Sequence, residues 1–276
     1  MVSNERKFSA LIERILGGVF VAGFSSFLFL GSAGVASAVV NPPRAPTSTA
    51  IISAQSISYT WNTSTAGGTE NVWVVRSSLA GTNAPVTAAL LSPTSTVLTY
   101  SFVGLATNTA YTFDVAGSDG SASSTLVTSS LVYTAAAVPG TPTLSSTGAQ
   151  NLLITMATDT NPAANTTYII KDTNASVGLK YLQADGTWGT ATATHSWAQL
   201  GSGSATTTTG LATNTQHTIS VAAVNGDSTN TTTYSATVSL YTNATVPSLP
   251  TLSSTGAQNL LITMATDTNP AANTTY

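Results

Sequence analysis

Residues 104–115 read GLATNTAYTFDV, and this stretch decides the predicted fold. Tyr111, Phe113 and Val115 alternate with polar or smaller residues, and a period of two is typical of a half-buried β-strand. The first half of the stretch recurs as GLATNT at residues 210–215, where it again precedes an alternating run. The chain therefore repeats one strand together with the turn that leads into it.

The repetition extends well beyond this stretch. Residues 142–168 and 250–276 are identical and read PTLSSTGAQNLLITMATDTNPAANTTY. A weaker match between the first and second copies aligns Trp61 with Met156 and leaves an insertion in the second copy. Repeats of about 100 residues are too long for solenoid units and predict separate domains arranged in a row.

Each repeat resembles a fibronectin type III domain. The run 104–115 is similar to the E–F corner and strand F of that family, with Leu105 and Tyr111 at its leucine and corner tyrosine positions. Trp61 falls at the strand B tryptophan of the family. The resemblance implies that the Tyr111 hydroxyl bonds to nearby backbone. The residues expected to form the core and the corners of the two modules are Trp61, Leu105, Tyr111, Met156, Leu211 and His217.

The second repeat departs from this pattern at its corner. His217 stands where the first repeat has Tyr111, and Met156 replaces the strand B tryptophan. Imidazole can make one hydrogen bond as phenol does, but it gains a charge in mildly acidic solution. We therefore expect the His217 corner to be the weaker one, and His217→Tyr to stabilise the second module.

The insertion carries an aromatic pair, Trp188 and Trp197. Exposed tryptophans can stack on sugars or pack against a protein partner, which makes the pair a possible ligand patch. Alternatively, the two rings cap the sandwich edge and fill the core volume lost at Met156. The second interpretation is favoured, because large aromatic side chains are usually buried.

The first residues are typical of an export signal. A basic segment at 1–14 precedes an uncharged apolar segment at 15–35, and Ala36 and Ala38 give the small-x-small pattern of a cleavage site. We expect a signal peptide over residues 1–38 that is cleaved after Ala38. The alternative is an uncleaved membrane anchor, because the apolar segment is long enough to span a bilayer.

The predicted fold class is all-β, with tandem fibronectin type III-like (immunoglobulin-like) β-sandwiches after an N-terminal signal peptide. The last segment should be too short to bury a core, so we expect an exposed hairpin or a disordered tail there. Its identity with part of module 2 would allow weak strand-swapped self-association. The predicted segments are the signal peptide at 1–38, module 1 at 39–138, module 2 with a strand C–E insertion at 139–246, and an incomplete module 3 with strands A and B only at 247–276.

The composition excludes several classes of function. The chain has 7 Lys and Arg against 10 Asp and Glu, and charged residues make up only 6% of it. This small number of Lys and Arg side chains cannot neutralise a run of phosphates. Nucleic acid is therefore not an expected partner. A membrane is expected to be contacted only through an uncleaved N-terminal segment. There is no cysteine, so each module must be stable through its core alone.

Catalytic and metal-binding motifs are not recognised. Neither His195 nor His217 belongs to a nucleophile motif, and no G-x-S-x-G elbow occurs. Asp159 and Asn161, and likewise Asp172 and Asn174, place oxygens at alternate positions. Calcium needs six to eight such ligands, so turn formation is the better interpretation. We therefore expect no enzyme activity, no catalytic residue, no cofactor and no metal site.

Taken together, these features predict an exported structural or adhesive protein, secreted or held at the cell surface. Its modules would serve as spacers and as platforms for an extracellular protein or glycan that the sequence does not identify. The alternative is the accessory stalk of a secreted polysaccharide-degrading enzyme whose catalytic domain is missing from this fragment. A third hypothesis is a carbohydrate-binding module that uses Trp188 and Trp197.

Overall fold

A computed structural model describes residues 48–62, 72–79, 85–91, 97–119, 122–174 and 178–275. The predicted signal peptide lies outside these residues. The chain divides into two compact units, residues 1–134 and 135–276. Within the described ranges there are strands and two 3-10 turns, η1 (Gly201–Gly203) and η2 (Ala271–Asn273), and no apolar helix long enough to cross a bilayer.

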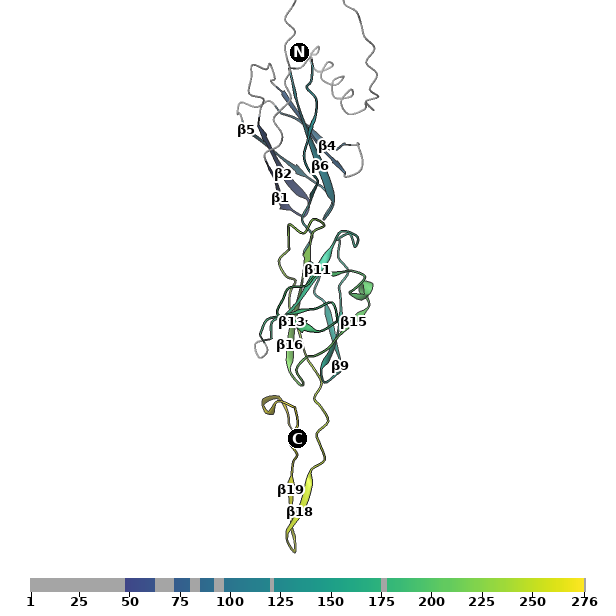
Figure 1. The fold of residues 1–276 in the computed structure, drawn as a ribbon, viewed down its shortest axis with the longest axis vertical. Helices are drawn as coiled ribbons and strands as arrows, with labels where there is room; N and C mark the ends of the chain where they lie inside the picture. Colours follow the sequence, from purple (N-terminus) through teal and green to yellow (C-terminus); the bar gives the residue numbers. More distant parts are fainter. Residues whose placement is uncertain are drawn as a thin grey trace, which may run out of the picture. The chain divides into compact units, whose positions relative to one another are not determined.

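Module 1, in the first unit, consists of two antiparallel sheets (Figure 1). One sheet has the strand order β1-β2-β5, and the other has the order β4-β3-β6-β7 with β8 also paired to β6. These orders correspond to A-B-E and C′-C-F-G of the expected sandwich, so the predicted all-β fold is confirmed. The strands are β1 (Ser48–Ser53), β2 (Ser56–Asn62), β3 (Val72–Leu79), β4 (Pro85–Leu91), β5 (Val97–Val103), β6 (Ala110–Ser118), β7 (Val127–Thr128) and β8 (Val132–Tyr133).

Side chains of both sheets meet in one core. Along β2 every second residue is buried, and Ile57, Tyr59 and Trp61 are fully inaccessible. The Tyr59 ring stacks on Trp61 in its own strand at 5.8 Å and on Phe113 of the opposite sheet at 5.5 Å. Aromatic stacking therefore links the two sheets of module 1 directly.

Module 2, in the second unit, repeats this arrangement and adds short strands from the insertion. Its sheets have the orders β9-β10-β15 and β13-β12-β11-β16-β17, with β14 also paired to β11. The insertion thus extends the C–F–G sheet on the far side of β11. The strands are β9 (Thr143–Gly148), β10 (Asn151–Thr155), β11 (Thr167–Asp172), β12 (Lys180–Leu182), β13 (Trp188–Gly189), β14 (His195–Ser196), β15 (Ala205–Thr208), β16 (Gln216–Val224) and β17 (Val238–Tyr241).

The second unit begins earlier in the chain than the predicted start of module 2. Ala136 is buried in the core of module 2. The neighbouring Ala137 is held by Asn161, whose side chain accepts from its N–H at 2.7 Å and donates to its C=O at 2.9 Å. Residues that the sequence placed at the end of module 1 therefore belong to the second unit.

The segment after module 2 forms a two-stranded hairpin, β18 (Thr251–Gly256) and β19 (Asn259–Thr263). Its sequence is identical to that of β9 and β10, but no further strand of the described chain pairs with it. Leu260 and Ile262 are 62% and 59% exposed, whereas their counterparts Leu152 and Ile154 are buried. The same residues are therefore core in one place and surface in the other, because only module 2 supplies an opposing sheet.

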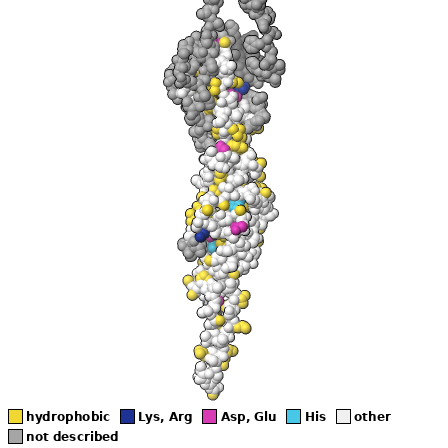
Figure 2. Space-filling view, in the orientation of Figure 1, with side chains coloured by type: hydrophobic (Ala, Val, Ile, Leu, Met, Phe, Trp, Pro, Cys, Tyr) yellow, Lys and Arg dark blue, Asp and Glu magenta, His cyan; other side chains and the backbone are white. Residues whose placement is uncertain are grey.

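The visible surface carries very little charge. In Figure 2 the described part of the displayed face is mostly white, the colour of the backbone and of side chains that are neither apolar nor charged, with scattered apolar side chains and few charged ones. On β9, for example, the exposed positions are Thr143, Ser145 and Thr147 rather than charged residues. Such a surface stays hydrated through hydroxyl and amide groups rather than through ions.

Candidate functional site

The E–F corner of module 1 is fastened by the Tyr111 side chain. The hydroxyl of Tyr111 accepts a hydrogen bond from the N–H of Ala106 at 2.9 Å, and Leu105 beside it is buried. The hydroxyl of Thr134 donates to the C=O of Ala106 at 2.7 Å. The N–H of Leu105 donates to the C=O of Gln55 at 3.0 Å, which ties the corner to the A–B turn.

The E–F corner of module 2 keeps the threonine and backbone hydrogen bonds of module 1 but lacks the bond that the Tyr111 hydroxyl makes there. The hydroxyl of Thr242 donates to the C=O of Ala212 at 2.6 Å, and the N–H of Leu211 donates to the C=O of Gln150 at 3.1 Å. Leu211 is buried, as Leu105 is. The His217 side chain turns to a different partner, so the corner is closed without it.

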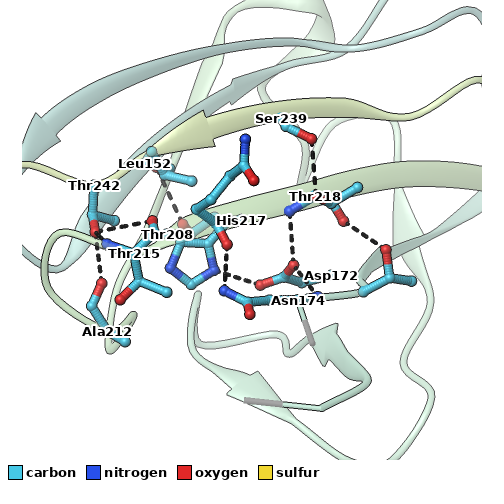
Figure 3. A network of polar contacts seen from close by, with 12 residues as sticks. Leu152, Asp172, Asn174, Thr208, Ala212, Thr215, His217, Thr218, Ser239 and Thr242 are labelled. Carbon is cyan, nitrogen blue, oxygen red and sulfur yellow. Dashed lines mark hydrogen bonds and ion pairs between the residues drawn. The ribbon is translucent and has the colours of Figure 1, made fainter. Parts of the chain in front are cut away.

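His217 forms a buried pair with Asp172 (Figure 3). Nδ1 of His217 donates to Oδ2 of Asp172 at 2.6 Å, and each side chain is only 1% exposed. The other carboxylate oxygen accepts from the backbone N–H groups of Asn174 and Thr218, both at 3.0 Å. The Asn174 side chain in turn donates to the C=O of Gln216. The network joins the end of β11 to the start of β16.

A histidine held by an aspartate is the orienting half of a catalytic triad, but this pair has no access to a substrate. Nε2 of His217 is buried and has no hydrogen-bond partner within the described ranges. The hydroxyls of Thr208 and Thr215, two residues drawn in Figure 3, donate to the C=O groups of Leu152 and Thr213. The geometry therefore describes an internal cross-link, not an active site.

The two modules fill the same corner with different pairs. Trp73, Val75 and Ser77 alternate inward along β3, and Tyr168, Ile170 and Asp172 do so along β11. In the alignment of the modules, the small Ser77 and the large Tyr111 stand at the positions of the larger Asp172 and the smaller His217. This finding reverses the expected effect of His217→Tyr, because tyrosine would crowd Asp172 and remove the donor that the buried carboxylate needs.

The aromatic residues of the insertion pack on the module 2 core. Trp188 and Trp197 are both half-buried against the cluster that contains Met156. The Trp197 ring lies 5.8 Å from the Tyr168 ring. His195, between them in sequence, is buried, and its Nε2 donates to the C=O of Leu182 at 3.0 Å. This packing supports the core-filling interpretation, and part of each indole remains accessible.

The alternating Asp and Asn residues form turns. The N–H of Asn161 donates to Asp159 at 2.9 Å, and the N–H of Asn174 donates to Asp172 at 3.0 Å. Both are Asx-turns, the interpretation favoured from the sequence. Asp159 also accepts from the Tyr168 hydroxyl, and burial together with this carboxylate raises the pKa of Tyr168 above its ordinary value. In the described part of the chain no three His, Asp or Glu side chains gather in a metal-binding group.

The partners of the basic side chains on the outer sheet faces, Arg76 and Lys171, could not be predicted from the sequence. Arg76 forms an ion pair with Asp114 at 2.7 Å on the outer side of module 1. In module 2 the ammonium group of Lys171 lies 3.6 Å from the centre of the Tyr234 ring. Partial burial and the neighbouring Tyr181 raise the pKa of Tyr234. Both bases therefore bind within their own module.

Comparisons with known proteins find distant similarities. No protein-family model and no curated protein match the chain. Among solved structures it is similar to a two-domain fibronectin type III segment of chicken tenascin (14% identity, TM-score 0.42, covering 74% of this chain and 100% of that one). It is also similar to the FN1–FN3 domains of chicken CNTN1, with 16% identity and a TM-score of 0.33 over 74% of this chain and 66% of that one. A redesigned β-sandwich protein is similar with 19% identity and a TM-score of 0.30 over 36% of this chain and 98% of that one.

The modules are fibronectin type III-like β-sandwiches. This statement rests on the strand orders of the two modules, A-B-E and C′-C-F-G, and on their shared corner bonds. Identities this low carry no information about a ligand or a partner.

Proposed function

We propose that this chain is an exported, non-enzymatic structural or adhesive protein, secreted or held at the cell surface. The observation that carries the proposal is the internal use of the reactive side chains in the described part of the chain. His217 is bound to Asp172, His195 to backbone and Arg76 to Asp114. These groups cross-link sandwiches, and an enzyme would instead turn such groups toward a cleft.

The spacer role is supported by the repeated architecture. Two sandwiches of one type follow each other, and the segment after them repeats the opening hairpin of module 2 letter for letter. Fibronectin type III-like modules in tandem are suited to separating other parts of a protein. An almost uncharged, hydroxyl-rich surface limits non-specific attraction between such modules and charged neighbours.

Export is tested by the N-terminus of the mature protein. When the chain is produced in a bacterial host with a general secretion pathway, we expect it outside the cytoplasm, beginning at Val39. Mass spectrometry of the N-terminal peptide measures this. Ala38→Leu is the matched control, because a large residue at this position should block cleavage while leaving the apolar segment intact. Recovery of the full chain from Met1 in the cytoplasm would refute the proposal.

The adhesive part of the proposal uses the accessible parts of Trp188 and Trp197, whose remaining surface packs on the core of module 2. Both rings keep an accessible part, and indole faces stack well on sugars. On a glycan array, the full chain should retain particular glycans, and Trp188→Ala should reduce that retention at least tenfold. Leu131→Ala, at an exposed apolar residue of module 1, is the control and should leave retention unchanged. Equal retention by both variants would remove this pair from the proposal.

Weak self-association by strand exchange also belongs to the proposal. Because β18–β19 and β9–β10 have one sequence, the tail of one copy can replace the first hairpin of module 2 in another copy with the same side-chain fit. Each exchange releases one hairpin for every hairpin that it buries. It therefore adds no net buried surface, and the association stays weak.

A further inference from the structure

The segment that follows the β18–β19 hairpin returns to module 2. Residues 269–275 read NPAANTT and contain the turn η2. The side-chain amide of Asn214, at the E–F corner, donates to the C=O of Asn273 at 2.8 Å and to the hydroxyl of Thr274 at 2.9 Å. In the other direction, the Asn273 side chain donates to the C=O of Asn214 at 3.2 Å.

A second contact holds the linker that leads into the hairpin. The Asn269 side chain accepts from the N–H of Thr245 at 2.7 Å and donates to its C=O at 2.8 Å. Asp267 orients this amide by accepting from the Asn269 N–H at 2.9 Å and from its side chain at 3.1 Å. Asp159 and Asn161 hold Ala137 in the same way. This arrangement, in which an Asp-oriented Asn side chain bonds to both backbone groups of a linker residue, is called the clasp, and it occurs twice in the second unit.

We propose that the E–F corner of module 2 is a docking site whose partner is the NPAANTT turn of the following repeat of the same chain. Together with the Asn269 clasp, this contact fixes the hairpin to module 2 and makes the connection between them stiff. The inference deepens the spacer role proposed above and rests on it, because a spacer holds a defined distance only when its joints are rigid.

Both surfaces are held in place before they meet. Asn214 adopts a left-handed backbone conformation with φ of 44°, which asparagine tolerates better than most residues. Its N–H donates to the C=O of Asn243 at 3.2 Å, which fixes the corner. On the partner turn, the hydroxyl of Thr274 donates to the C=O of Pro270 at 2.9 Å. Little conformational freedom is therefore lost on docking, which strengthens a contact made of few bonds.

The covalent link explains why so small a contact suffices. Between free molecules, a few partly exposed amide hydrogen bonds would compete poorly with water. Here the linker between Thr242 and Thr251 keeps the turn near the corner, at an effective concentration of roughly millimolar for a short tether. The docking site therefore recognises the next repeat of its own chain and should bind a separate peptide only weakly.

Distances between two spin labels test this coupling directly. The chain has no cysteine, so Ser253→Cys on β18 and Thr207→Cys on β15 give two unique labelling sites at exposed positions. In the full chain we expect a narrow distance distribution from double electron–electron resonance. Asn214→Gly with Asn273→Ala should broaden it at least twofold. Glycine is chosen at 214 because it keeps the left-handed backbone while removing the amide.

Two further variants complete the experiment. Asn230→Ala, in the loop at the other end of β16, should leave the distribution narrow. Asn273 lies outside module 2, so Asn273→Ala alone should leave the fold of module 2 intact. If the double variant does not fold, the width of the distance distribution in Asn273→Ala alone tests the inference. A broad distribution in the parent chain, or an unchanged one in Asn273→Ala and in the double variant, would overturn the inference. Neither outcome depends on export or glycan retention, so failure here is distinguishable from failure of the proposed function.

Discussion

Trp61→Ala is expected to lower the free energy of unfolding of module 1 by about 3–5 kcal/mol, the range for removing a large aromatic side chain from a core. Trp61 is fully buried on β2 and stacks on Tyr59 at 5.8 Å. It pairs across the sheet with Leu98, which is also buried. Because the chain has no disulfide, the core alone supports module 1, and the lost contacts should appear in full as lost stability.

Hydrogen exchange followed by mass spectrometry in the full chain measures this effect, because it reports peptides of modules 1 and 2 separately. Trp61→Met is the informative comparison, since Met156 occupies the matching position in module 2, and it should cost less than alanine. Thr60→Ala, at the adjacent outward position, should change stability by about 1 kcal/mol or less. A loss of under about 1 kcal/mol in Trp61→Ala would show that module 1 does not depend on this side chain.

The sandwich could be predicted from the sequence because its signals are local. Ile57, Tyr59 and Trp61 alternate within one strand, and the structure buries all three. A period of two needs only neighbouring residues to be recognised, and the turn motif before Tyr111 marks where the next strand begins. The repeated sequence then extends the assignment from one module to the other.

The partners of individual polar groups could not be predicted in the same way. The alignment matches His217 with Tyr111 and predicts a bond to corner backbone. The spacing of Asp172 and Asn174 predicts only a turn. The signal was nevertheless present, because Asp172 continues the inward alternation of Tyr168 and Ile170 along β11. A carboxylate at an inward strand position requires a buried donor, and that requirement points to an opposite strand.

The Asn214–Asn273 contact was missed for a different reason. Asparagine in a turn already has a sufficient local explanation, namely its tolerance of left-handed backbone and its Asx-turn bonds. Its second role, as a donor to a segment about sixty residues away, leaves no pattern in the neighbouring sequence. Repetition is the remaining clue, because the turn and the clasp both lie in the part that repeats letter for letter.

The buried pair of module 2 gives the second large effect. His217→Tyr and Asp172→Ser should each lower the free energy of unfolding of module 2 by about 3–5 kcal/mol, the range for removing one partner of a buried pair. The first leaves the Asp172 carboxylate with only the N–H groups of Asn174 and Thr218. The second removes the carboxylate that accepts from Nδ1 of His217, whose side chain is only 1% exposed.

The double variant Asp172→Ser with His217→Tyr should recover at least about 2 kcal/mol relative to the sum of the single losses, because it gives module 2 the two residues, Ser77 and Tyr111, that module 1 has at the matching positions. The new hydroxyl would then lie near the N–H of Ala212, as that of Tyr111 does near Ala106. Tyr111→Phe in module 1 calibrates this bond and should cost about 0.5–1.5 kcal/mol. Urea unfolding followed by hydrogen exchange measures all four variants, with β11 and β16 as the readout for the three in module 2 and β6 as the readout for Tyr111→Phe. If the loss of unfolding free energy in the double variant instead equals the sum of the two single losses, serine and tyrosine cannot replace Asp172 and His217 in module 2. Residues outside the pair would then determine which side chains fit there.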